Sequence, residues 1–148
     1  MDRRRIQKLL ELRQKALDTK VSELGAARQA VETAIAAVTR AASALERAAD
    51  ERKQMNRAGA DWQTWVTTQD WMSLKAREFS AAQQQKSHCE RLAERALAAV
   101  HKARSEALRI EALLARVDSE ARQKELRKER RAEDEFQANQ SAREEISR

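Results

Sequence analysis

Two heptad patterns of apolar residues occupy the two halves of the chain. In the first half, large apolar side chains recur every seven residues from Leu10 to Leu45. In the second half, a heptad pattern of mostly apolar residues extends from Met72 to Ala121. Apolar residues with a period of about 3.5 are typical of helices that pack as a left-handed coiled coil. The patterns therefore predict two long amphipathic helices.

The stretch between the two patterns is where the helix is expected to stop. Gly59 can adopt the left-handed backbone conformation that ends many helices. Thr67, with Asp70 three residues later, resembles the capping box that begins a helix, and Asp61 between them could cap a short turn. The sequence predicts a joint at residues 58–68.

This joint separates a first helix, from about residue 3 to 57, from a second helix, from about residue 69 to 145. The predicted fold class is all-α, with the two long helices forming an antiparallel coiled-coil hairpin. We expect residues 1–148 to form a single domain. After Lys124 the second helix has no counterpart in the first, so a charged overhang is expected there.

The two seams also suggest how the helices are aligned. If the residue numbers of opposed positions sum to 127, large side chains meet small ones in several layers. This register sets Val38 beside Cys89 and Met55 beside Met72. A register seven residues away satisfies the same heptads and stays open.

Composition supports a long helical protein over a compact globule. The chain of 148 residues has no proline or tyrosine, two glycines and 36% charged residues, and alanine supplies much of its 41% apolar fraction. Alanine favours helix but contributes little buried area. No apolar run approaches the roughly 18 residues of a membrane span, and the amino terminus lacks the apolar core of a signal peptide. We expect a cytoplasmic protein without membrane insertion.

Candidate catalytic and metal-binding residues are few. His88 and His101 are 13 residues apart and fall on different faces of a helix, so they cannot form a metal-binding pair. The lone Cys89 occupies a seam position, where a small buried side chain is the simpler interpretation than a reactive thiol. There is no glycine-rich phosphate loop, and two helices offer no cleft for a small-molecule substrate. We expect no enzyme, metal or cofactor.

The net charge of +6 is concentrated near both ends of the chain. In a hairpin, the two basic segments would meet at one pole. Its cations are Arg3, Arg4, Arg5, Arg127, Lys128, Arg130 and Arg131. A solvated face and a protein-docking pole are the two leading interpretations. Nucleic-acid binding ranks third, because acidic residues are interleaved and no aromatic platform lies within either segment.

All three tryptophans, Trp62, Trp65 and Trp71, lie within or beside the joint. Trp62 and Trp65 are three residues apart and would share one face of a short helix. A local aromatic cap that closes the hairpin is one interpretation. A protein-binding patch is the other, because exposed aromatic clusters mark interaction sites.

With the segment LLELRQKALDTKVSEL near its start, a joint near its middle and RKERRAEDEF near its end, the chain resembles the FliJ/YscO family. These are the central-stalk proteins of flagellar and virulence type III secretion export ATPases. The resemblance implies an antiparallel coiled coil, similar to that of the gamma subunit of rotary ATPases, inserted in the centre of a hexameric ATPase ring. It also implies contact with an export-gate protein and binding of secretion chaperones.

On this basis, the expected function is that of a non-enzymatic stalk, peripheral to a membrane-embedded secretion apparatus. The basic pole would dock into the hexameric secretion ATPase, and the tryptophan joint would meet the export-gate protein or chaperones. The alternative from another class is a structural coiled-coil adaptor or scaffold rod with no ATPase partner. A basic nucleic-acid-binding helical protein is the third hypothesis.

Overall fold

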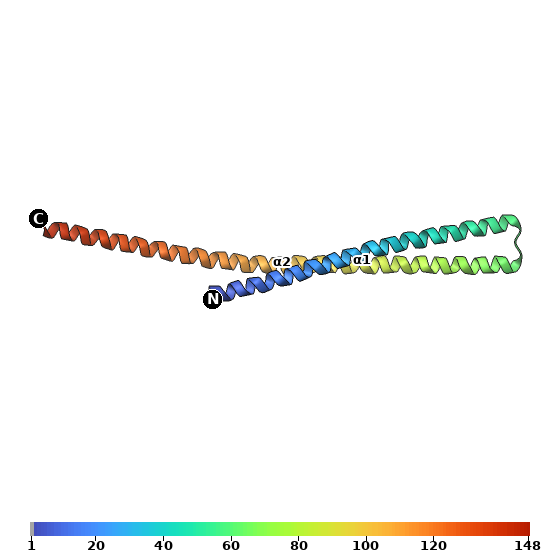
Figure 1. The fold of residues 1–148 in the computed structure, drawn as a ribbon, viewed down its shortest axis with the longest axis horizontal. Helices are drawn as coiled ribbons and strands as arrows, with labels where there is room; N and C mark the ends of the chain where they lie inside the picture. Colours follow the sequence, from blue (N-terminus) through green and yellow to red (C-terminus); the bar gives the residue numbers. More distant parts are fainter. Residues whose placement is uncertain (1) are drawn as a thin grey trace. The chain divides into compact units, whose positions relative to one another are not determined.

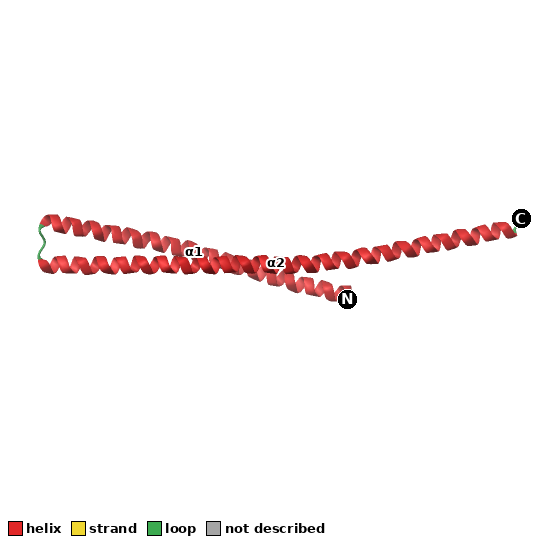
Figure 2. Cartoon of the chain, turned by 180° about the vertical axis from the view of Figure 1, so that it is seen from behind, coloured by secondary structure: helices red, strands yellow, loops and turns green. Residues whose placement is uncertain are grey.

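The computed structural model describes residues 2–148, which form two long α-helices. Helix α1 spans Arg3–Ala58 and helix α2 spans Trp62–Ile146 (Figure 1). A single short loop joins them, and helix accounts for nearly all the rest of the described chain (Figure 2). The predicted fold class, an all-α antiparallel hairpin of two long helices, is confirmed.

Helix α1 has polar caps at both ends. Oδ1 of Asp2 accepts a hydrogen bond from the amide of Arg4 at 3.3 Å, and its backbone carbonyl accepts one from the amide of Ile6 at 3.2 Å. At the other end Gly59 has a φ of 69°, and the amide of Ala60 donates to the carbonyl of Met55 at 3.2 Å. This is the Schellman arrangement, in which a left-handed glycine satisfies the last free carbonyls of a helix. The predicted stop at Gly59 is confirmed.

Helix α2 begins earlier than predicted. Asp61 caps it: Oδ1 of Asp61 accepts a hydrogen bond from the amide of Thr64 at 2.9 Å, and its carbonyl accepts one from the amide of Trp65 at 3.0 Å. Thr67 lies inside the helix, where its hydroxyl donates to the carbonyl of Gln63 at 2.9 Å. The predicted joint of residues 58–68 and the predicted helix start near residue 69 are therefore wrong. A single carboxylate at the N-cap position is enough to start the helix before the Thr67 capping signal is reached.

The residues group into two units, each containing part of both helices. One unit comprises the chain up to Ala16 together with Arg104–Arg148, and the other comprises Leu17–Ala103. The buried side chains fall at heptad positions in both units. They are Ile6 and Ala107 in the first unit, and Leu24, Ala34, Ala48, Thr68, Cys89 and Val100 in the second. The predicted seams are confirmed at these positions, and Thr68 extends the second seam one heptad closer to the loop.

Two contacts near the loop define how α1 and α2 are aligned. Oγ1 of Thr68 lies 2.9 Å from Sδ of Met55, and Nη1 of Arg52 lies 3.5 Å from Sδ of Met72. The predicted pairing of Met55 with Met72 is wrong, because each residue contacts a position about half a heptad away. Because the loop has only three residues, α2 begins nearer to α1 in the sequence than predicted, and Met55 meets a residue closer to the loop. A half-heptad shift still keeps both seams facing each other, since core positions are spaced alternately by three and four residues.

This alignment continues along the second unit. Ala34 lies 21 residues before Met55, and Cys89 lies 21 residues after Thr68, which is three heptads along each helix. Both residues are buried. Extended over three heptads, this alignment sets Cys89 at the level of Ala34, whereas the sequence predicts Val38 as its partner. Leu24 lies four heptads before Arg52, and Val100 lies four heptads after Met72. Both are buried, so the Arg52–Met72 contact predicts that they lie at the same level.

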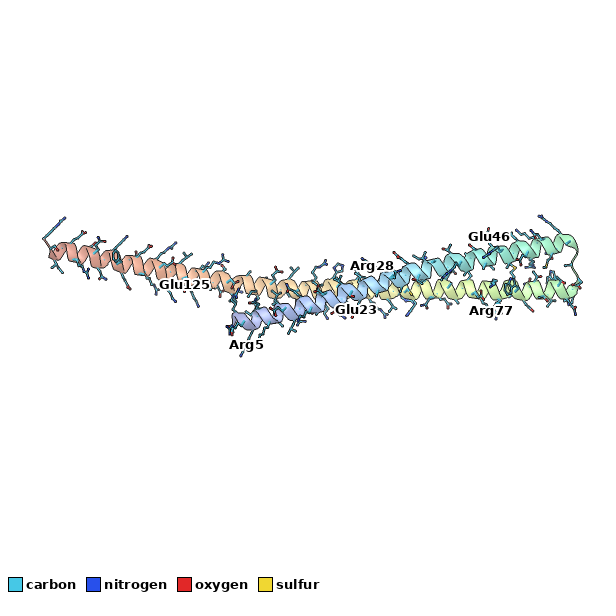
Figure 3. The ribbon with its side chains drawn as sticks, viewed as in Figure 1. Arg5, Glu23, Arg28, Glu46, Arg77 and Glu125 are labelled. Carbon is cyan, nitrogen blue, oxygen red and sulfur yellow. The ribbon has the colours of Figure 1, made fainter. Side chains whose placement is uncertain are left out.

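The last part of α2 is exposed over its whole circumference. Every residue from Ser119 to Arg148 is exposed, including the predicted seam residue Ala121. Figure 3 shows side chains standing out all along this part of the helix, where Glu125 is labelled. The exposed stretch, residues 119–146 of α2, thus begins a few residues earlier than the predicted overhang.

Candidate functional site

Trp62 and Trp65 form a stacked pair in the first turn of α2. Their ring centroids are 5.4 Å apart and their planes are inclined by only 18°. Trp62 is 74% exposed, whereas Trp65 is half-buried. The guanidinium carbon of Arg52, on α1, lies 5.8 Å from the centroid of Trp65, within the range of a cation–π interaction. Residues 52–65, which carry this pair and this cation, are called the hairpin end below.

Trp71 lies on a different surface. Its side chain is 47% exposed, and Nζ of Lys75 lies 4.4 Å from its ring centroid. Trp71 lines an open groove of about 730 Å³, called the Trp71 groove below. The groove is lined by Glu51, Met55, Thr67, Thr68, Asp70, Trp71, Ser73, Leu74 and Arg77. The predicted tryptophan cluster is therefore divided into a stacked pair and a groove.

The charges differ between these two surfaces. The hairpin end carries Arg52, Lys53 and Arg57, and none of them forms an ion pair with residues 2–148. Its one carboxylate, Asp61, accepts hydrogen bonds from Thr64 that lower its pKa, so it is committed to capping α2. The hairpin end is consequently a positive surface. The Trp71 groove is mixed in charge, with carboxylates from Glu51 and Asp70 and a guanidinium from Arg77.

The predicted basic pole begins at an ion pair between the helices of the first unit. Nε of Arg3 lies 2.6 Å from Oδ1 of Asp118. The hydrogen bond from Arg3 lowers the pKa of Asp118, and the positive charges of Arg3 and Arg122 act in the same direction. The same hydrogen bond raises the pKa of Arg3. A second interhelical pair joins Arg13 to Glu106 at 2.9 Å.

The other predicted cations of the pole lie in two places. Arg4 and Arg5 are exposed at the start of α1, where Figure 3 labels Arg5. The four on α2 belong to the exposed stretch: Arg127, Lys128, Arg130 and Arg131. At 1.5 Å per residue, Arg127 lies roughly 13 Å beyond Asp118 along the helix axis. Arg3 thus contacts Asp118, while the four later cations lie farther along an uncovered helix.

Sequence reasoning missed the acidic partners Asp118 and Glu106, and the cap formed by Asp2. Asp118 follows the seam residue Val117, a flanking position from which interhelical ion pairs are made in coiled coils. Its partner could have been found only with the correct alignment of the helices. Asp2 could have been recognised directly, because an aspartate just before a helical pattern is a common N-cap.

Residues 2–148 hold no group of three or more His, Cys, Asp or Glu side chains arranged to bind a metal ion. Neither α1 nor α2 combines the length and the apolar character that a membrane-spanning helix needs.

The fold defines a class of protein: a coiled-coil hairpin of two long helices, with uncovered side chains at its hairpin end and along its exposed stretch. The model of the flagellar FliJ protein family matches residues 1–145 of the chain. The chain belongs to this family, and is accordingly a component associated with flagellar or type III export. The family is one of cytoplasmic, structural components of the export apparatus. No curated protein and no solved structure matches the chain.

Proposed function

We propose that this protein is the central stalk of a hexameric export ATPase, which inserts into the ATPase ring and promotes its assembly or activity. The observation that carries the proposal is the exposed stretch of α2, a long helix that no other part of the described chain covers. Its residues 122–131 include six basic and two acidic side chains. A helix with so few large apolar residues can contact a ring without being held in one fixed position.

The physical argument concerns symmetry and charge. Two helices have no sixfold axis, so within a ring they touch the subunits unequally and can distinguish one subunit from the next. The positive charges would steer the exposed stretch toward acidic ring surfaces. Salt weakens such steering beyond a Debye length of about 8 Å at physiological ionic strength.

The tryptophan surfaces would contact other parts of the export apparatus. Trp62, at the hairpin end, and Trp71, in its groove, are exposed aromatic side chains available to an export-gate protein or a secretion chaperone. Aromatic side chains dominate the energetics of many protein interfaces. We place the protein in the cytoplasm, peripheral to a membrane-embedded secretion apparatus.

The test is charge reversal on the exposed stretch. Replacing Arg127, Lys128, Arg130 and Arg131 by glutamate should reduce stimulation of the purified export ATPase and leave the helix content unchanged. The matched control reverses four other exposed cations of α2: Arg91, Arg95, Lys102 and Arg109. Undiminished stimulation by a protein truncated before Arg122 would contradict the proposal.

The alternative function is a structural adaptor without an ATPase partner. The Trp71 groove and the Trp62–Trp65 pair favour it, because both are explained by partner binding alone. An adaptor role gives no reason for the charged exposed stretch. Purification of the protein from native cells separates the two functions: a stalk brings the ATPase with it, and an adaptor does not.

A further inference from the structure

We propose that the hairpin end binds an acidic peptide segment of its partner, through Trp62, Trp65 and the guanidinium of Arg52. This inference rests on the proposed function, in which the hairpin end is a partner-binding surface, and it names the chemistry of that partner. Three features of the hairpin end lead to it: an open aromatic face, a cation without a carboxylate, and an excess of positive charge.

The aromatic face is preformed. Trp62 stacks on Trp65 at a centroid distance of 5.4 Å, yet remains 74% exposed. Stacking holds the Trp62 ring in one orientation, so less conformational freedom is lost when a partner covers it. A large aromatic surface left in water at the start of a helix is typical of a binding site.

Arg52 is the unusual cation of the seam. It is half-buried, with its guanidinium carbon 5.8 Å from the Trp65 ring centroid and Nη1 3.5 Å from Sδ of Met72. No carboxylate of residues 2–148 forms an ion pair with it, whereas Arg3 and Arg13 each have one. A guanidinium has five N–H donors arranged to hold a carboxylate. A glutamate or aspartate of a partner would supply the acceptor that the chain itself does not.

The surrounding charges select an acidic segment. Lys53 and Arg57 lie on the same helix as Arg52, one residue and five residues along, and neither has an ion pair within the described chain. Asp61 is the only carboxylate of the hairpin end and is engaged with Thr64. The hairpin end therefore attracts an acidic segment. Hydrogen bonds between its cations and the carboxylates of such a segment are stronger than hydrogen bonds between neutral groups.

The Trp71 groove does not share this preference. Glu51 and Asp70 line it, and Lys75 already lies over the Trp71 ring. Arg77 also lines it, so the two carboxylates offset the two cations, and the groove has no excess of positive charge to attract an acidic peptide. Single-stranded nucleic acid fits the hairpin end less well than a peptide does, because such ligands follow a continuous positive track with successive aromatic platforms. The hairpin end has only one stacked pair of rings, Trp62 and Trp65, and Asp61 interrupts its positive charges.

The experiment uses the full chain and the nuclear magnetic resonance signals of its three indole N–H groups. The probe is a short capped peptide of glutamate, leucine and glycine, and its matched control carries glutamine in place of glutamate. We expect the acidic peptide to shift the Trp62 and Trp65 signals in a saturable manner and leave Trp71 unmoved. The glutamine peptide should bind at least about tenfold more weakly, and added salt should reduce the difference.

Variants then locate the carboxylate site. Arg52→Gln should weaken binding of the acidic peptide by about tenfold, and Arg52→Lys should have a smaller effect because it keeps the charge. Arg40→Gln, at an exposed arginine of the same helix, is the control and should bind normally. Circular dichroism of each variant shows that the helices are intact.

Several results would overturn the inference: equal binding of the glutamine peptide, a shift confined to Trp71, or equal shifts with single-stranded oligothymidine. No export component is present in this experiment, so its outcome is independent of the ATPase measurements. If a Trp62 and Trp65 double variant loses an export partner while the acidic peptide fails to bind, the proposed peptide chemistry is wrong and the stalk function is untouched.

Discussion

Oγ1 of Thr68 lies 2.9 Å from Sδ of Met55, and this contact between α2 and α1 fixes the alignment of the hairpin near its loop. The Thr68 hydroxyl donates its hydrogen to the carbonyl of Thr64 at 2.7 Å, which leaves the oxygen satisfied inside the seam. A buried threonine thus replaces an aliphatic residue at one core position without an unpaired polar group.

The first prediction tests this alignment farther from the loop. Replacing Ala34 with cysteine should allow an intramolecular disulfide with Cys89 on gentle oxidation, because the alignment sets the two positions opposite each other. Bridging requires Cα atoms within about 7 Å. Intact mass and non-reducing electrophoresis measure the product. The control is Val38→Cys, and a disulfide formed by that variant but not by Ala34→Cys would show that the alignment changes along the helices.

At the seam, the sequence predicts which residues are buried but not which residues they face. Leu24, Ala34, Cys89 and Val100 are buried as their heptad positions indicate. Their partners across the hairpin could not be predicted. Core positions within each helix are spaced alternately by three and four residues, so the two seams can also face each other after a shift of half a heptad. The choice depends on loop length. Either Asp61 or Thr67 could have started the second helix by local capping chemistry.

The separation of Trp71 from the Trp62–Trp65 pair also depends on where the second helix begins. Within a helix, nine residues at about 100° each place Trp71 on the opposite side from Trp62. The sequence alone predicts a joint that extends to residue 68, and within a joint the angle between Trp62 and Trp71 is not defined. The three-residue spacing of Trp62 and Trp65 did predict that they share a face, and their stacking confirms it.

The second prediction concerns burial at the start of α1. Ile6 is completely buried, whereas Leu12 is 62% exposed. Ile6→Ala should lower the free energy of unfolding of the amino-terminal part of α1 by about 2 kcal/mol, the low end of the usual range for such a change. Leu12→Ala should change it by less than about 0.5 kcal/mol. Amide hydrogen exchange in the full chain measures both, and equal effects would contradict the burial described here.

The third prediction concerns the ion pair of Arg3 with Asp118. Because the pKa of Asp118 is lowered in the folded protein, the stabilisation is fully present above the pKa of an unfolded aspartate, about 3.9. It is lost as the pH falls through the lower folded value. Asp118→Asn should therefore speed amide exchange at the start of α1 at neutral pH and remove part of its acid sensitivity. Asp50→Asn, at an exposed aspartate, should do neither.

The fourth prediction concerns the cap of α2. Hydrogen bonds from Thr64 lower the pKa of Asp61, so its contribution is likewise present above about pH 3.9 and is lost on further acidification. Asp61→Ala should expose the Thr64 amide and accelerate its exchange, while Asp61→Asn, which keeps an acceptor, should have a smaller effect. An unchanged exchange rate at Thr64 in the alanine variant would contradict the capping role.

The last prediction separates binding from folding at the hairpin end. Trp62 is 74% exposed, and Trp65 stacks on it from the first turn of α2, so neither is one of the fully buried core side chains. Replacing both by alanine should leave the helix content nearly unchanged. It should weaken binding of an export-gate protein or secretion chaperone by about thirtyfold or more, the loss expected for an aromatic hot spot of roughly 2 kcal/mol. Val21→Ala, at another exposed apolar residue of the same unit, is the control and should bind normally.

Circular dichroism measures the helix content, and titration calorimetry measures binding independently. A double variant that unfolds would show that the stacked pair closes the hairpin as an aromatic cap. A double variant that folds and binds normally would show that the stacked pair is not the binding surface and would favour Trp71 and its groove.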